Sequence, residues 1–130
     1  MNTILVVEDD DLVRDIIAQK VELMGFNVIK ARDGLRAYHI LEDNEQIDLV
    51  ITDVAMPEMD GLTLIKKIKA NEQMAGLPII ISSGVVGPRE IAEVLDVGAT
   101  AFIPKPIRSG DLEDYICRYL KKPRLSNCGH

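Results

Sequence analysis

The stretch Ile47-Asp48-Leu49-Val50-Ile51-Thr52-Asp53-Val54-Ala55-Met56-Pro57-Glu58-Met59-Asp60-Gly61 decides the fold of this chain. Its run Leu49–Ile51 is apolar without alternation, which is typical of a strand covered on both faces. Pro57 and the pair Asp60-Gly61 are turn residues. Asp53 therefore follows the carboxyl end of a buried strand, where open α/β sheets bind their ligands.

The same unit, a short apolar strand followed by an amphipathic helix, occurs five times along the chain. The predicted strands are Thr3–Val7, Phe26–Ala31, Asp48–Thr52, Pro78–Ser82 and Thr100–Pro104. The predicted helices run from Leu12 to Met24, through Ala37 to Leu41, from Leu62 to Ile68, from Pro88 to Leu95, and from Ser109 or Asp111 to Leu120. Five successive units predict an α/β fold, a doubly wound five-stranded parallel sheet in the flavodoxin-like order 2-1-3-4-5 with helices on both faces.

Single residues mark the ends of these elements. Asp10 is placed to cap the amino end of the first helix, and Gly25 to end it. Gly98 ends the fourth helix in the same way. Pro104 cannot donate a hydrogen bond to a neighbouring strand, which favours an edge position for the fifth strand, as the order 2-1-3-4-5 requires.

The length of 130 residues fits one domain with its own core. We expect this domain to span residues 1–122, followed by a tail or truncated linker at 123–130. The sequence leaves open whether the chain is a whole protein or one domain of a longer one.

Composition excludes several classes of function. The net charge is −6 and aromatic residues make up 4 %, so no basic field or stacking platform favours direct nucleic-acid binding. Met1–Val7 has neither a basic segment nor a long apolar run, so we expect no signal peptide, no membrane contact and a cytoplasmic protein. Cys117 and Cys128 lack the spacing of a zinc site.

Polar residues follow four of the five predicted strands. Glu8 and Asp9 follow the first strand, Asp53 the third, Ser83 the fourth and Lys105 the fifth. In the order 2-1-3-4-5 the first and third strands are neighbours, and the chain winds in opposite directions from that point. The carboxylates of Glu8, Asp9 and Asp53 should therefore share one crevice.

Crowded carboxylates repel one another unless a cation is present. An all-oxygen ligand set favours Mg²⁺, which completes its shell with water and phosphate. Lys105 adds a second positive charge and Ser83 a hydroxyl that can donate to a phosphoryl oxygen. This set of groups suits attack by the Asp53 carboxylate on a phosphoryl group to give an aspartyl phosphate.

These residues carry a family resemblance. The sequence resembles the receiver domain of bacterial two-component response regulators, of the chemotaxis single-domain kind, over residues 3 to about 121. The motifs are Leu5-Val6-Val7-Glu8-Asp9-Asp10, Asp53-Val54-Ala55-Met56-Pro57-Glu58-Met59-Asp60-Gly61, Ser83-Gly84 and Phe102-Ile103-Pro104-Lys105-Pro106. The resemblance implies a regulatory phosphoacceptor that promotes its own phosphorylation and dephosphorylation, not an enzyme for other substrates.

The resemblance also implies roles for individual residues. Asp53 matches the phosphoacceptor, and Glu8 and Asp9 match the acidic pair that holds Mg²⁺, Asp9 directly and Glu8 through water. The backbone carbonyl of Ala55 matches a further metal ligand. The other matches are Ser83 to the switch hydroxyl, Lys105 to the phosphate-binding lysine, Phe102 to the aromatic residue that turns inward with it, and Lys105-Pro106 to a peptide bond that is often cis.

The chain departs from the usual receiver pattern at four positions. Glu8 is longer than the more common Asp, and Phe102 lacks a phenolic hydroxyl. Ala55 and Val85 are apolar at positions that flank the phosphoryl group in the family. We expect the lifetime of the aspartyl phosphate to depend on these last two residues.

Phosphorylation adds about two negative charges at one end of the sheet. The loop Gly84-Val85-Val86-Gly87 and the helix after it are the predicted two-state element, because glycine stands at both ends of the loop and Ser83 ties it to the phosphate. The surface built from the helix Pro88–Leu95, the strand Thr100–Pro104 and the last helix should change with it. The implied partners are a sensor histidine kinase or phosphotransfer protein as donor and an unidentified output protein.

Three other functions fit these residues less well. An aspartate-nucleophile phosphatase needs a second acidic residue two positions after the nucleophile, where this chain has Ala55. A nucleotide or flavin module would need the glycine-rich and lysine-bearing phosphate loops that are missing. A phosphorylation-independent, receiver-like binding module is disfavoured because every acceptor-site group is present.

Overall fold

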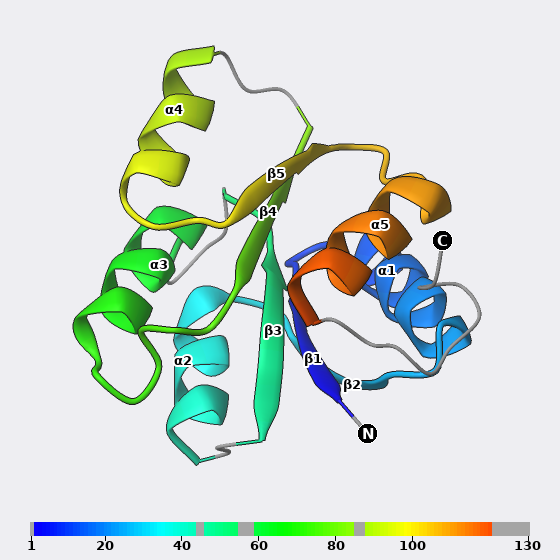
Figure 1. Cartoon of the computed structure of the whole chain (residues 1–130), viewed down its shortest axis with the longest axis horizontal. Helices are drawn as coiled ribbons and strands as arrows, with labels where there is room; N and C mark the ends of the chain where they lie inside the picture. The colour runs from blue at the N-terminus through cyan, green and yellow to red at the C-terminus, as the bar shows by residue number, and fades with distance from the viewer. Residues whose placement is uncertain (1, 44–45, 55–58, 85–87, 121–130) are drawn as a thin grey trace.

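The structure is a computed structural model that describes residues 2–43, 46–54, 59–84 and 88–120. Strands and helices alternate along the chain (Figure 1). They are β1 (Thr3–Val7), α1 (Asp11–Leu23), β2 (Asn27–Ala31), α2 (Gly34–Asp43), β3 (Ile47–Thr52), α3 (Gly61–Ala70), β4 (Ile79–Ser83), α4 (Pro88–Asp96), β5 (Ala101–Pro104) and α5 (Ser109–Leu120). The predicted tail, residues 123–130, lies outside the described residues.

The five strands form one parallel sheet in the order β2-β1-β3-β4-β5, which confirms the predicted topology. Strand β3 lies at the centre. Strand β5 lies at an edge, where Pro104 pairs with Ser83 of β4. The edge position of Pro104 agrees with its missing N–H group.

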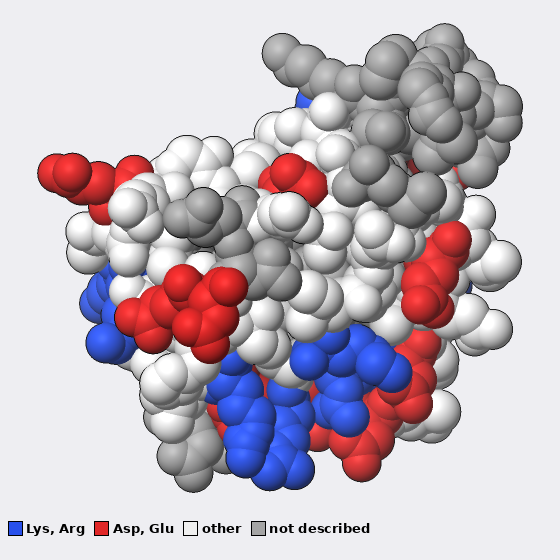
Figure 2. All heavy atoms as spheres, turned by 90° about the horizontal axis from the view of Figure 1, so that it is seen from below, with Lys and Arg blue, Asp and Glu red and all other residues white. Residues whose placement is uncertain are grey.

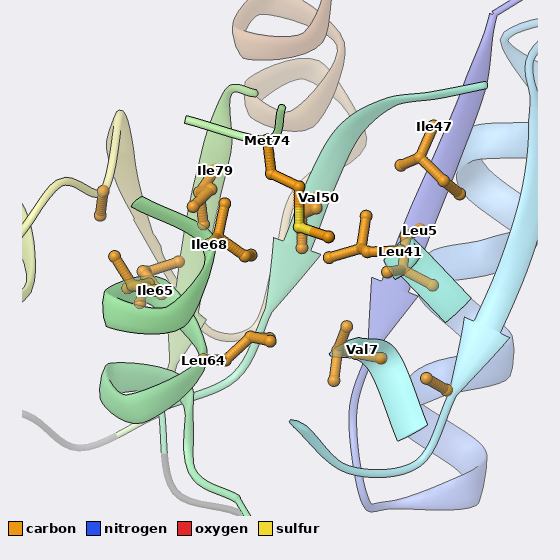
Figure 3. Packing of buried hydrophobic residues seen from close by; sticks show 14 of the residues in the cluster. Leu5, Val7, Leu41, Ile47, Val50, Leu64, Ile65, Ile68, Met74 and Ile79 are labelled. Carbon is orange, nitrogen blue, oxygen red and sulfur yellow. The ribbon is translucent and has the colours of Figure 1, made fainter. Parts of the chain in front are cut away.

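Helices cover both faces of the sheet, as Figure 1 shows. One apolar cluster joins the sheet to α1 and α5, and the other joins it to α2, α3 and α4. The cluster with α2, α3 and α4 contains strand residues such as Leu5 and Val50 together with Leu64, Ile65 and Ile68 of α3 (Figure 3). The central strands are apolar on both faces because both faces are buried.

The predicted element ends are close to those observed. Asp10 caps α1 by accepting a hydrogen bond from the Val13 N–H. Gly25 and Gly98 follow α1 and α4 with φ of +96° and +129°, in the region that glycine tolerates best. Strand β4 begins one residue later than predicted, at Ile79, after a proline that has no N–H to donate.

The surface at the amino-terminal ends of the strands carries charges of both signs. Figure 2 shows this face, on which Lys and Arg side chains gather along one edge with Asp and Glu side chains beside them. Among the described helices, none has the length and apolar character needed to cross a bilayer.

Strand register brings two segments with predicted site residues together at the opposite end of the sheet. Val7, the last residue of β1, pairs with Thr52, the last residue of β3. The next residues, Glu8 and Asp53, therefore leave neighbouring strands at the same level. The Asp53 N–H also donates to the Val7 carbonyl at 3.1 Å, which continues the strand pairing by one step.

Candidate phosphoryl-transfer site

Three acidic side chains meet at the carboxyl end of the sheet. One carboxylate oxygen from each of Glu8, Asp9 and Asp53 lies within 4.8 Å of the other two. Glu8 and Asp53 are buried, with 2 % and 8 % of their surface exposed, while Asp9 is exposed. The three residues are thus placed together as the strand order predicted, with one side of the cluster open to solvent.

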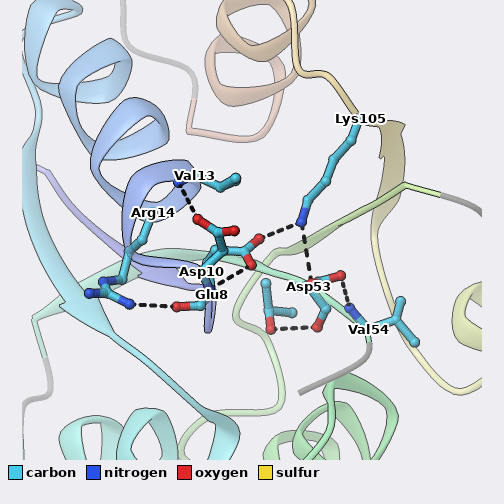
Figure 4. Close-up of polar contacts among 8 residues, drawn as sticks. Glu8, Asp10, Val13, Arg14, Asp53, Val54 and Lys105 are labelled. Carbon is cyan, nitrogen blue, oxygen red and sulfur yellow. Dashed lines mark hydrogen bonds and ion pairs between the residues drawn. The ribbon is translucent and has the colours of Figure 1, made fainter. Parts of the chain in front are cut away.

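Lys105 reaches this cluster from the end of β5. Its Nζ lies 2.5 Å from Glu8 Oε1 and 3.3 Å from Asp53 Oδ2, so one ammonium group bridges two carboxylates (Figure 4). The preceding backbone is held by a hydrogen bond from the Lys105 N–H to the Ser83 carbonyl at 3.0 Å. The peptide bond between Lys105 and Pro106 is cis, as the resemblance implied.

The Asp53 carboxylate is held on both oxygens. Oδ1 accepts a hydrogen bond from the Val54 N–H at 2.7 Å, and Oδ2 faces the Lys105 ammonium group. The Thr52 hydroxyl donates to the Asp53 carbonyl at 3.0 Å. These contacts fix the orientation of the carboxylate that the sequence marks as the candidate nucleophile.

The pKa values of Glu8 and Lys105 are both raised, which disfavours the charged form of Glu8 and favours the charged form of Lys105. Burial raises the pKa of the Glu8 carboxyl, because the hydrogen bonds from Lys105 and the Asp10 N–H offset that effect only in part and the Asp53 charge adds to it. Burial lowers the pKa of the Lys105 amine, but its hydrogen bond to Glu8 and the charges of Asp53 and Glu8 outweigh this, so its pKa is raised. The charged form of Lys105 is therefore favoured here, whereas the charged form of Glu8 is disfavoured.

The oxygen cluster fits a hard divalent cation. Mg²⁺ binds oxygen ligands at about 2.0–2.1 Å in an octahedral shell, which spaces neighbouring and opposite ligands by about 3–4 Å. The observed limit of 4.8 Å for Glu8, Asp9 and Asp53 requires only a small contraction. Ala55, whose carbonyl the resemblance adds to this set, lies outside the described residues.

The remaining predicted site residues lie on β4 and β5. Ser83 is buried at the carboxyl end of β4, next to the strand that leads to Lys105. Phe102 is half-buried on β5 and packs against the cluster formed with α2, α3 and α4. Val85, which was expected to flank the phosphoryl group, lies outside the described residues.

Sequence reasoning missed Arg14. Its guanidinium donates to the Glu8 carbonyl and to the Asp11 carboxylate, so it joins the acidic turn to helix α1. The signal that could have found it is a basic residue three positions after Asp11, within one helical turn of the acidic segment. That spacing alone describes an ordinary surface ion pair, and only the fold shows the contact with Glu8.

Comparisons with known proteins agree with the sequence resemblance. The family model described as "Response regulator receiver domain" matches residues 4–117. A two-component response regulator from rice, Oryza sativa subsp. indica, is 33 % identical over 117 residues, which cover 90 % of this chain and 80 % of the relative. A chemotaxis protein CheY homolog from Campylobacter jejuni is 36 % identical over 104 residues, covering 79 % of this chain and 80 % of that protein.

Solved structures resemble the whole described fold. The signal receiver domain of a signal transduction histidine kinase from Syntrophus aciditrophicus superposes with a TM-score of 0.86 at 31 % identity. The match covers 93 % of this chain and 91 % of that domain. The similarity thus extends over nearly the whole chain and shows the same fold.

Proposed function

The chain belongs to the response regulator receiver domain family, and we propose that it is a two-component signalling switch that accepts a phosphoryl group on Asp53. The observation that carries this proposal is the bridging of Asp53 and Glu8 by Lys105, with the Asp9 carboxylate alongside. An acidic nucleophile, an oxygen cluster for Mg²⁺ and a lysine together meet the electrostatic needs of phosphoryl transfer.

The proposed reaction is transfer from a phosphohistidine on a sensor kinase or phosphotransfer protein. A lone pair of an Asp53 carboxylate oxygen forms the new P–O bond, and the electron pair of the breaking P–N bond returns to the imidazole nitrogen of the donor. Lys105 donates to a phosphoryl oxygen and offsets its negative charge. Mg²⁺, held by Glu8, Asp9, Asp53 and the Ala55 carbonyl, would supply further charge neutralisation when bound.

The proposed switch involves Ser83 and Phe102. Ser83 ends β4 at the same edge of the sheet as Asp53, and its carbonyl accepts the Lys105 N–H. A hydroxyl drawn toward the phosphoryl group would free space on the side of Phe102, whose strand pairs with β4. The change would then reach the surface formed by α4, β5 and α5, where we place the output partner.

A groove beside Lys105 offers a docking place for the donor. It has a volume of about 480 Å³ and lies between α1 and the segment after β5. Its lining residues are Val13, Ile16, Ile17, Lys20, Lys105, Pro106 and Ile107. Leu12 and Ile16 add exposed apolar surface on α1, at 70 % and 44 %. A helical donor seated there would bring its phosphohistidine close to Lys105, and we propose that transfer occurs in the cytoplasm.

The central experiment uses a small phosphodonor. The protein is incubated with acetyl phosphate and Mg²⁺, and intact mass is recorded with and without hydroxylamine. We expect one added phosphoryl group that hydroxylamine removes and that is absent from Asp53→Ala. Equal labelling of wild type and Asp53→Ala, or failure of wild type to become labelled, would refute the assignment of Asp53.

Donor docking is tested separately with a phosphotransfer protein. Ile16→Glu should slow transfer from the protein donor while leaving labelling by acetyl phosphate unchanged. Leu95→Glu, on α4 and also exposed at 41 %, serves as the control. Equal transfer rates for the two variants would contradict the groove as the docking place.

A further inference from the structure

Arg14 crosses from helix α1 to the acidic turn that follows β1. Its Nη1 donates to the backbone carbonyl of Glu8 at 2.9 Å, and its Nη2 lies 2.5 Å from Asp11 Oδ1 (Figure 4 shows the first contact). The two partners differ in burial, because Glu8 is buried while the Asp11 side chain is 86 % exposed. The Arg14 side chain itself is only 15 % exposed, so it is packed against the turn.

The Glu8 carbonyl belongs to the peptide group that joins the two candidate metal ligands, Glu8 and Asp9. A peptide group is planar, so a donor that fixes its oxygen also fixes the direction in which the Asp9 Cα leaves it. In the preceding peptide group, the Glu8 N–H donates a hydrogen bond to the Ala31 carbonyl at 3.0 Å. The contact with Arg14 therefore limits how far the Asp9 carboxylate can swing from Asp53.

The Glu8 carboxylate is oriented by the same turn. Its Oε2 accepts the Asp10 N–H at 3.1 Å, while Asp10 caps α1 through the Val13 N–H at 3.0 Å. Arg14 lies in the first turn of that helix, and its backbone N–H donates to the Asp10 carbonyl. Arg14 therefore contacts the acidic segment at two points, with its guanidinium at the Glu8 carbonyl and its backbone N–H at the Asp10 carbonyl.

We propose that Arg14 is a positioning residue for the divalent cation site, acting through the Glu8–Asp9 peptide group. This inference rests on the proposed function, in which Glu8 and Asp9 hold Mg²⁺. Groups that orient metal ligands typically change metal affinity by about 10–100-fold when removed. A planar guanidinium suits this role because it donates to two partners from one rigid fork.

The alternative role for Arg14 is purely electrostatic, and it predicts the opposite sign. A positive charge close to an acidic cluster repels an incoming cation, so its loss should tighten metal binding. Positioning predicts that the loss of Arg14 weakens binding although the site becomes more negative. The direction of the change therefore separates the two roles without reference to its size.

The experiment measures Mn²⁺ affinity by the electron paramagnetic resonance signal of the free ion, with no phosphodonor present. The variants are Arg14→Met, which keeps the apolar stem, and Arg14→Lys, which keeps the charge but has a single donor nitrogen in place of the two that Arg14 uses. Lys30→Met is the matched control. Lys30 also pairs with an exposed aspartate, Asp15, at 3.1 Å, and the substitution removes one positive charge, as Arg14→Met does. Circular dichroism and urea unfolding establish that each variant is folded.

We expect Arg14→Met to bind Mn²⁺ about 10-fold more weakly than wild type, Arg14→Lys to recover part of this loss, and Lys30→Met to bind at least as tightly as wild type. If Arg14→Met does not fold, the comparison of Arg14→Lys with Lys30→Met decides. Equal or tighter binding by the Arg14 variants would overturn the inference alone. Failure of wild type to bind Mn²⁺ would instead count against the proposed function.

Discussion

The interior of strand β3 and the residue that follows the strand lie in opposite environments. Its interior residues Leu49, Val50 and Ile51 are at most 1 % exposed and lie among apolar neighbours from both helical layers. Two residues after Ile51, Asp53 is nearly as buried, but it lies among carboxylates and an ammonium group. The same burial that stabilises the first region raises the pKa of Glu8 in the second.

The apolar core stabilises the fold, whereas the buried Glu8 carboxylate of the site destabilises it. Removing apolar surface from water stabilises the core in proportion to the area buried. Burying Glu8 beside Asp53 has a cost that Lys105 offsets only in part. A site that holds excess negative charge favours a cation or a transferred phosphoryl group with its metal, so the local cost is tied to the proposed function.

The largest expected effect is in the core. Leu64 of α3 is fully buried in the cluster of Figure 3, and Leu64→Ala should lower the free energy of unfolding by about 2–5 kcal/mol because it leaves a cavity. Leu23→Ala, on a side chain that is 79 % exposed, should change it by less than about 0.5 kcal/mol. Urea unfolding followed by circular dichroism measures both, and equal losses would contradict the assigned core.

The second-largest effect is expected from a substitution at Gly61, between the apolar core and the acidic site. Gly61 begins α3, and a Cβ added there would lie 2.2 Å from the Asp53 carbonyl oxygen, a backbone atom that cannot move freely. Gly61→Ala should therefore cost about 1–3 kcal/mol and slow phosphorylation by acetyl phosphate, because it displaces Asp53.

Gly110→Ala is the matched control for this change. An added Cβ at Gly110 meets nothing within 4 Å, and the residue lies in α5. Alanine should stabilise that helix by about 0.5–1 kcal/mol and leave the phosphorylation rate unchanged. A wild-type phosphorylation rate in Gly61→Ala would show that the close approach does not position the acceptor.

A smaller effect is expected from the Glu8 charge. Since its pKa in the folded protein is raised above the ordinary value of 4.5, the folded state binds this proton more tightly than the unfolded state. Without divalent cations, stability from this group is lost as pH rises through 4.5 and then through the raised pKa. Glu8→Gln should thus be more stable than wild type at pH 7 and lose that advantage below pH 4.5.

Mg²⁺ should make wild type more stable than Glu8→Gln, the reverse of the order expected without it. At 100 times its Kd, a cation that binds only the folded state raises stability by about 2.7 kcal/mol, and wild type should gain more than Glu8→Gln. Urea unfolding from pH 4 to pH 8, with and without Mg²⁺, tests both statements. A Glu8→Gln protein that is less stable than wild type at pH 7 without Mg²⁺ would show that the ion pair with Lys105 outweighs burial.

The smallest change concerns a polar atom inside the apolar region. The Ser82 hydroxyl is buried on β4 and has no hydrogen-bond partner among the described residues. An unpaired buried hydroxyl costs about 1–3 kcal/mol, but removing its oxygen also loses packing contacts. Ser82→Ala should therefore raise the free energy of unfolding by up to about 1 kcal/mol. A loss of stability in the same urea measurement would indicate that this hydroxyl has a partner in solution.

Much of the fold could be predicted because each strand and helix carries its own local pattern. Uninterrupted apolar runs marked the central strands, and residues such as Asp10, Gly25 and Gly98 marked helix ends that the structure places within a residue or two. The meeting of Glu8, Asp9 and Asp53 followed from topology, since parallel strands send their carboxyl ends to one edge. Their chemical roles remain predictions for the experiments above.

The sequence by itself determined which residues form strands, which form helices and which end of the sheet carries the polar groups, because these depend on periodicity and on chain direction. Only the tertiary structure decided that Lys105 bridges Glu8 and Asp53, that burial raises the pKa of Glu8, and that Arg14 holds the Glu8 carbonyl. The physical reason is that such contacts depend on distances of a few ångströms between segments far apart in the chain, or across a turn, which local patterns do not encode.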